Sequence, residues 1–307
     1  QTSTTVSRTL WHVALLVGTG TVLGISTTLA KLAGEAGIAP LPFLSCTVFG
    51  SSLLLVGLAV LRRDPPPVNG KTLEYYALAG LLSLAAPNLI YFAAAPRIGA
   101  GYVALSLAFP PLYTYAGALL LGLETFVLSR AIGVMLALAA VSVLAAYKIS
   151  EPAAEIGWIA AVLAAPVFLA IGNLYRVVRW PAGTTPAQLA PGMLVGSLAI
   201  LALAWLLAPD SLTEPWSISP WIGLLIVAQT MTFAGFYYLF FVLLDLAGPV
   251  YVSFTGSIGA VAGAAIAIAL LGEPAPGGLL LAAVLTGAGV VLVTRRKSGQ
   301  PQNDPGA

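Results

Sequence analysis

Charged residues are scarce in this chain. Asp, Glu, Lys and Arg make up 8% of the 307 residues, whereas 59% are hydrophobic. The charges fall in short gaps between long apolar runs, and the longest polar stretches, around residues 62–72, 209–219 and 295–307, are too short to fold with a core of their own. This pattern predicts a protein that works within a lipid bilayer.

The side chains that most catalytic sites need are also few. The chain has one cysteine, Cys46, which cannot form an internal disulfide, and one histidine, His12, near the start of the first apolar run. No cluster of metal ligands and no glycine-rich phosphate loop is evident. We therefore expect no catalytic residue, no metal, no cofactor and no enzymatic activity. An intramembrane lipid-acting protein remains the alternative, although serine-histidine catalysis would need a histidine deeper in the membrane.

The long apolar runs predict transmembrane helices, because about 20 such residues are needed to cross roughly 30 Å of hydrocarbon. Ten runs qualify. We expect an all-α integral membrane protein with transmembrane helices at 10–32, 41–61, 73–95, 98–121, 126–147, 156–180, 186–208, 220–244, 248–271 and 277–294.

The distribution of positive charge predicts the orientation, since Lys and Arg in short loops stay on the cytoplasmic side. With ten spans, only Lys31, Arg97 and Lys148 fall on the side opposite the termini. Both termini are thus expected to be cytoplasmic, and the net charge of +2 gives no indication of nucleic-acid binding. The cations assigned to the cytoplasmic side are Arg8, Arg62, Arg63, Lys71, Arg130, Arg176, Arg179, Arg295, Arg296 and Lys297.

The chain also matches itself when it is shifted by 149 residues. Tyr102 then falls on Tyr251, Ser106 on Thr255 and Glu124 on Glu273, while the first helices align with shifts of 147 or 148. We expect two five-helix repeats, 1–150 and 151–307, and an odd number of helices inverts the second copy. Inverted repeats are typical of secondary transporters. Chance similarity between apolar helices is the alternative.

Several short motifs resemble the EamA-type drug/metabolite transporter superfamily. They are Gly24-Ile25-Ser26, the run from Tyr91 to Pro110, Glu124, Asn173-Leu174-Tyr175-Arg176 and Leu271-Gly272-Glu273. The resemblance implies ten helices, no ATPase domain, and export or exchange of metabolites such as amino acids across the bacterial inner membrane. The run 105–111 is most similar to the aromatic amino-acid exporter branch.

Proline and glycine mark the places where helices could be interrupted around a substrate cavity. The candidates are Pro87, Pro110-Pro111 and Pro166, with Gly235 and Gly259 in related regions. Irregular backbone is tolerated in a membrane only inside protein or along a wet cavity. The alternative is that these prolines only kink helices for packing.

Polar and aromatic side chains share helix faces near these breaks. Aromatic rings would stack on an apolar substrate body, and amide and hydroxyl groups would bind its polar end. For Tyr102 the alternative is an interfacial belt, and for Ser106 and Thr255 it is interhelical hydrogen bonding. The predicted substrate-binding residues are Asn88, Tyr91, Tyr102, Ser106, Phe109, Pro110, Asn173, Gln229, Phe233, Tyr237 and Thr255.

These features together predict a secondary transporter that moves small organic metabolites, with amino acids as the favoured substrates, by alternating access. No Asp or Glu lies in the middle of a predicted span, which favours uniport or exchange; proton-coupled antiport is the alternative. The expected partners are the substrate and membrane lipids, and the protein is expected to be a monomer or a weak homodimer. Gly20-x-x-x-Gly24 and Gly259-x-x-x-Gly263 are interpreted as internal packing faces rather than dimer contacts.

Overall fold

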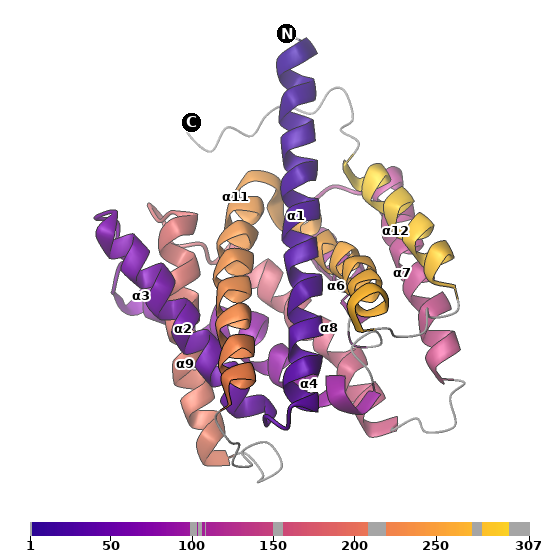
Figure 1. Cartoon of the computed structure of the whole chain (residues 1–307). Helices are drawn as coiled ribbons and strands as arrows, with labels where there is room; N and C mark the ends of the chain where they lie inside the picture. Colours follow the sequence, from indigo (N-terminus) through magenta and orange to yellow (C-terminus); the bar gives the residue numbers. More distant parts are fainter. Residues whose placement is uncertain are drawn as a thin grey trace.

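The computed structural model describes residues 2–98, 103, 106–107, 109–149, 156–207, 219–271 and 278–294. Regular structure in these ranges is entirely helical, with no strand, which confirms the all-α class. The elements are α1 (Thr2–Glu35), α2 (Pro40–Leu61), α3 (Gly70–Gly80), the π-helix η1 (Leu81–Ala85), α4 (Ala86–Ile98), α6 (Pro110–Leu120), α7 (Leu128–Ile149), α8 (Ile156–Val178), α9 (Pro186–Leu207), α11 (Pro220–Leu271) and α12 (Leu279–Thr294) (Figure 1).

In the described part of the chain, six helical segments are long and apolar enough to cross a membrane. The surface agrees with this, because large apolar side chains such as Leu61 and Leu120 are more than 80% exposed, whereas Gln229 and Ser51 are fully buried. Polar groups inside and apolar groups outside suit a lipid environment. The six segments are Leu10–Glu35, Pro40–Leu61, Gly70–Ile98, Ile156–Val178, Pro186–Leu207 and Pro220–Leu270.

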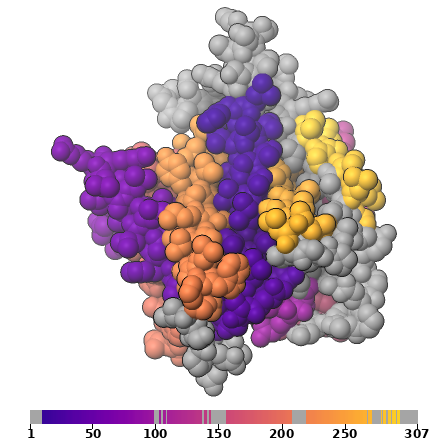
Figure 2. Space-filling view, in the orientation of Figure 1, coloured from indigo at the N-terminus to yellow at the C-terminus, as the bar shows by residue number. Residues whose placement is uncertain are grey.

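Helix α11 is bent into two arms at Gly248. This glycine has φ 80° and ψ 176°, a conformation that residues with a Cβ rarely adopt, and Pro249 follows it. The predicted runs 220–244 and 248–271 are therefore joined by a sharp kink. Helix α1 stands between the two arms, and it is visible along much of its length on one face of the molecule (Figure 1 and Figure 2).

The contact between α1 and the second arm of α11 is made of glycines. A Cβ atom at Gly24 would lie 2.6 Å from the backbone nitrogen of Gly263, and one at Gly20 would lie 2.6 Å from Cβ of Ile258. The two backbones can approach this closely only because small residues face each other. The prediction that these glycines pack within the chain is confirmed.

The predicted helix interruptions have different outcomes. Helix α6 begins at Pro110, after a turn at Leu107, so the predicted span 98–121 is interrupted at the predicted proline; a proline within a helix removes a hydrogen bond and clashes with the preceding turn. Helix α8, by contrast, runs through Pro166 without a break. The chain also remains helical through Pro87, but the five residues of η1 lie just before it.

Candidate functional site

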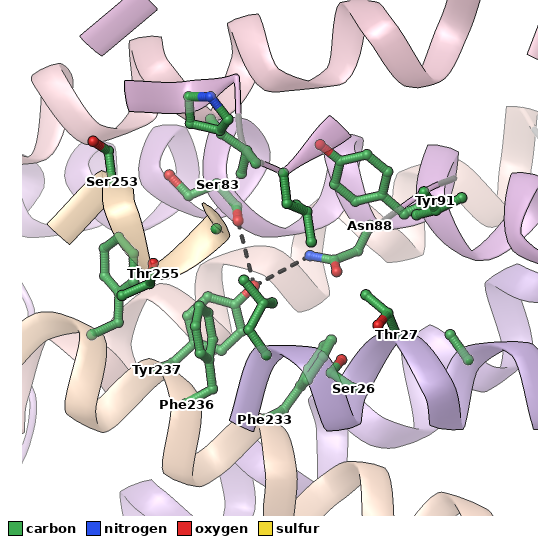
Figure 3. A pocket seen from close by; sticks show the side chains of 18 of the residues that line it. Ser26, Thr27, Ser83, Asn88, Tyr91, Phe233, Phe236, Tyr237, Ser253 and Thr255 are labelled. Carbon is green, nitrogen blue, oxygen red and sulfur yellow. Dashed lines mark hydrogen bonds between the residues drawn. The ribbon is translucent and has the colours of Figure 1, made fainter. Parts of the chain in front are cut away.

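A cavity lies among α1, η1, α4, α6, α8 and both arms of α11. It encloses about 780 Å³ of empty space including its opening. Its wall is largely aromatic and aliphatic, with a small number of polar side chains that point inward from different helices (Figure 3). This is the usual composition of a small-molecule site. The aromatic residues of the wall are Tyr91, Phe92, Phe233, Phe236, Tyr237 and Phe240.

Most of the residues predicted from the sequence meet at this cavity. Helices that are far apart in the chain contribute them, and the π-helix and the kinked α11 bring them to one place. The predicted residues that line the cavity are Asn88, Tyr91, Pro110, Asn173, Phe233, Tyr237 and Thr255.

The other predicted residues lie elsewhere. Ser106 is buried behind the wall and donates a hydrogen bond to the Val103 carbonyl at 2.8 Å. Gln229 is also buried, and its Nε2 donates to Oγ of the lining residue Ser26 at 2.6 Å, so it supports the wall from behind. Phe109 packs against the hydrophobic core, and Tyr102 lies outside the described residues.

Three helical segments are linked at the cavity by a small hydrogen-bond network. The Asn88 side chain donates to the Leu84 carbonyl at 2.8 Å and to the Tyr237 hydroxyl at 3.2 Å, and that hydroxyl donates to the Ser83 carbonyl at 3.4 Å (Figure 3). In a regular α-helix the Ser83 carbonyl would accept a hydrogen bond from the backbone N–H of residue 87, but Pro87 has no N–H. The π-helix thus presents its carbonyls to side chains, and such π turns often occur at functional sites.

Arg176 of α8 also lines the cavity and is only 2% exposed. Its Nε donates to the Gly172 carbonyl at 3.2 Å, its Nη2 donates to Oδ1 of Asn173 at 2.6 Å, and its Nη1 lies 4.0 Å from Sδ of Met193. Its guanidinium carbon is 4.4 Å from the centre of the Phe240 ring. Arg176 therefore lies in a helix and inside the protein, not in an exposed loop.

The burial of Arg176 follows from its position on its helix. It stands two residues before the end of α8 and on the same face as Gly172 and Asn173, which turn inward. Arg179, one residue beyond the helix, is exposed instead and pairs with Glu74 at 3.0 Å. Counting cations along the sequence does not distinguish these two arginines.

Arg176 has no anionic partner among the described residues. The acidic side chains there lie elsewhere: Glu35 pairs with Lys31, Glu74 with Arg179 and Glu124 with Arg130, while Asp64 bonds Gln188 and Asp245 is exposed. Charged side chains inside a membrane are costly and are usually paired or functional. The described part of the cavity therefore holds one buried positive charge that no described acidic side chain compensates.

We refer to Ser83, Asn88, Asn173, Arg176 and Tyr237 as the polar cluster. Its parts are contiguous, because Ser83 Oγ lies so close to Gly172 that a Cβ there would be 2.2 Å away, and the Gly172 carbonyl accepts from Arg176. The Ser83 hydroxyl is buried and has no hydrogen-bond partner in the described part of the chain. Nearby, the buried Tyr91 hydroxyl approaches Ser106 without meeting hydrogen-bond geometry.

A second set of lining residues, here called the α1–α11 wall, comes from α1 and the second arm of α11 and consists of Ser26, Thr27, Ser253 and Thr255. Three of these hydroxyls donate within their own helices: Thr27 to Gly24, Ser253 to Val250 and Thr255 to Val252, at 2.9, 2.6 and 2.8 Å. Such local bonds satisfy the hydroxyl groups without a ligand.

Sequence analysis missed Arg176, Ser26, Thr27, Ser83 and the phenylalanines Phe236 and Phe240. For Arg176 a signal existed, because it falls inside the predicted span 156–180 and three residues after Asn173. The serines and threonines gave no such signal, since small hydroxyl residues are common in membrane helices. No group of three or more His, Cys, Asp or Glu side chains that could hold a metal occurs among the described residues.

Comparison with known proteins places these features in a wider context. No curated protein matches the chain. Among solved structures, one titled "Crystal structure of protein" has a TM-score of 0.67 at 19% identity, and the match covers 92% of this chain and 96% of that one, which shows a shared fold. Residues 10–146 match the model of the EamA-like transporter family.

Proposed function

We propose that this chain is a secondary transporter of small organic metabolites, with amino acids, including aromatic ones, as the favoured substrates. The match of residues 10–146 to the EamA-like transporter family supports the proposal. The observation that carries the proposal is the cavity. It lies between helices from both halves of the chain, is mostly apolar, and has its only charged described side chain, Arg176, within the polar cluster. Such a site suits a molecule with an apolar body and a polar end.

We propose that transport proceeds by alternating access between two inverted repeats, residues 1–150 and 151–307. If a two-fold axis relates the repeats, a helix that lies beside the axis contacts the equivalent helix of the other repeat. Two observed contacts support this arrangement: α2 packs against α9, and α7 packs against α12. Inverted repeats of this kind place the substrate near the axis and open it to each side in turn.

Individual residue pairs support the same register. Asn88 and Tyr237, which are hydrogen-bonded at the cavity, are 149 residues apart. The contact of Gly24 with Gly263 becomes the contact of Asn173 with Thr114 when the same shift is applied. A register of 149 residues over the first helices replaces the shifts of 147 and 148 and makes Thr27 the counterpart of Arg176.

The favoured mode of transport is uniport or exchange, because the described lining contains no carboxylate that could carry a proton. Proton-coupled antiport is the alternative, followed by an intramembrane lipid-acting role. The proposed location is the bacterial inner membrane with both termini in the cytoplasm, and the proposed direction is export. We infer no enzymatic activity, because the family is one of transporters.

Counterflow in proteoliposomes tests the proposal. Vesicles preloaded with an unlabelled amino acid, nucleoside or sugar would take up the labelled form, with and without a pH gradient. We expect saturable counterflow of one class without a gradient. Failure of every solute with folded protein would overturn the proposed function.

A matched pair of tryptophan substitutions would link that flux to the cavity. Thr27→Trp fills the cavity and should abolish counterflow, whereas Phe49→Trp, on the outer surface where Phe49 is 60% exposed, should leave it intact. Thermal unfolding of both variants checks that each is folded. Equal flux in the two variants would contradict a route through this cavity.

A further inference from the structure

We propose that Arg176 binds the carboxylate of the substrate, so that this transporter recognises organic monoanions with an apolar, aryl-compatible body and does not require an ammonium group. This inference rests on the proposed function for its setting, but its evidence is separate. It depends on the charge, the donors and the neighbours of one buried side chain.

The charge comes first. Arg176 is 2% exposed, lines the cavity, and has no carboxylate partner among the described residues. A guanidinium remains protonated in proteins, so the positive charge persists when the side chain is buried. A single anionic group entering the cavity would compensate it, whereas a cationic group would be repelled.

The hydrogen-bond donors point the same way. A guanidinium has five N–H donors in a planar fork, and three of those of Arg176 have acceptors in the described structure: Gly172, Asn173 and, weakly, Met193. One donor on each terminal nitrogen is thus left for a ligand. Two donors in this fork match the two oxygens of a carboxylate.

Asn173 has a positioning role in this arrangement. Its Oδ1 accepts from Nη2 of Arg176 at 2.6 Å, and its amide nitrogen lies 3.5 Å from the Thr114 hydroxyl of α6. An amide fixes the guanidinium without neutralising it. An acidic residue at the same place would neutralise the positive charge that binds the ligand.

The surroundings define the rest of the ligand. The Phe240 ring lies under the guanidinium and packs against Phe236 at 5.5 Å, and Phe236 packs against Tyr237 at 5.0 Å. An aromatic surface therefore begins directly beside the charge. No acidic side chain among the described lining residues is placed to receive an ammonium group.

The first test uses the unmodified protein and a matched set of probes: 3-phenylpropionate, its amide and phenethylamine. Binding is measured by the ligand-induced rise in the unfolding temperature in detergent, and flux by inhibition of counterflow. We expect the acid to bind about 30-fold or more tightly than the amide, and phenethylamine not to bind, because an unpaired buried charge is expensive. Equal binding of acid and amide would overturn the inference.

Variants then assign the effect to Arg176. Arg176→Met should remove the preference for acid over amide, and Arg176→Lys should retain part of it, since a lysine keeps the charge but loses the fork. Arg179→Gln, three residues away and exposed, is the control and should change neither. A preference for the acid that survives in folded Arg176→Met would overturn the assignment, and if that variant does not fold, the probe set decides.

The outcomes also separate this inference from the proposed function. Tight binding of the acid with no flux of any solute would overturn transport and leave the anion site standing. Saturable counterflow of a neutral or cationic solute, with no binding of the acid, would overturn the anion site and leave transport standing.

Discussion

Two parts of the cavity lining, the polar cluster and the α1–α11 wall, are built by different means. In the polar cluster, hydrogen bonds join α11 to α4 and η1, and Ser83 of η1 packs against Gly172 of α8. Among the described residues, donors of Arg176 and the Ser83 hydroxyl have no partner. The α1–α11 wall is held by backbone contact between glycines, and its threonines bond to their own helices.

The difference indicates that the polar cluster recognises the ligand, whereas the glycine contact of the α1–α11 wall packs the helices together. Unpartnered buried donors are unfavourable until a ligand supplies acceptors, so the polar cluster is poised to bind. The glycine contact contributes close packing, which tolerates no added atoms. Substitutions in the polar cluster should therefore change ligand affinity, and substitutions in the glycine contact should change folding.

The largest expected effect comes from giving Arg176 an internal partner. Asn173→Asp places a carboxylate where Oδ1 already accepts from Arg176, which removes the uncompensated charge and repels an incoming anion. We expect carboxylate affinity to fall by about 2–5 kcal/mol, with thermal stability unchanged or higher. Calorimetric titration measures it.

The control for that substitution is Asn69→Asp. Asn69 caps α3 and accepts from the Thr72 amide, a role that aspartate fulfils equally well, so affinity and stability should remain at wild-type values. Undiminished carboxylate binding in Asn173→Asp would contradict the role of the polar cluster.

The next largest effect should occur in the glycine contact. Gly24→Ala places a methyl group 2.6 Å from the Gly263 backbone nitrogen, so the helices must separate, at a cost of about 1–3 kcal/mol in the free energy of unfolding. Gly18→Ala, on the same helix with open space around it, should instead stabilise the protein by about 0.5–1 kcal/mol. Thermal unfolding in detergent compares them, and effects of the same sign would refute close packing at Gly24.

A smaller effect is expected for Tyr237→Phe. Loss of the hydroxyl removes the donor to the Ser83 carbonyl and the acceptor for the Asn88 amide, at a cost of about 1 kcal/mol in stability. Tyr113→Phe is the control, because Tyr113 is at the surface with 37% exposure. Unfolding curves of the two variants should differ; identical curves would show that the network contributes nothing.

The smallest effect is expected on the α1–α11 wall itself. The Thr27 hydroxyl already donates to the Gly24 carbonyl, so Thr27→Val should change carboxylate affinity by less than about twofold. The same titration that measures Asn173→Asp would show this. A loss as large as that of Asn173→Asp would mean that both walls recognise the ligand.

The positions of the helices can be predicted well from the apolar runs. A long apolar segment in a membrane must form its backbone hydrogen bonds internally, and a helix does so. The kink at Gly248 and the start of α6 at Pro110 occur where the sequence predicts a gap and a break. Pro166 shows the limit of that argument, since α8 accommodates this proline without a break.

The site was harder to predict, because side-chain direction depends on how helices pack. Asn88 and Tyr237 were chosen for their faces and do meet at the cavity, whereas Gln229 shares a face with Phe233 and yet turns toward Ser26 behind the wall. Rules based on charge treat helix ends as membrane boundaries, so they do not separate Arg176 from the cations of the loops. Only the packing of α8 shows that this end is inside the protein.

The π-helix has a geometric consequence for the same residues. A π turn holds one residue more than an α turn, and one residue corresponds to about 100° of rotation around a helix axis. If Leu81–Ala85 regained regular α geometry while α3 stayed in place, every residue after it would rotate by about that angle. Asn88 and Tyr91 would then face a different neighbour. The extra residue of the π-helix therefore fixes the rotation of α4 about its axis that directs these side chains into the cavity.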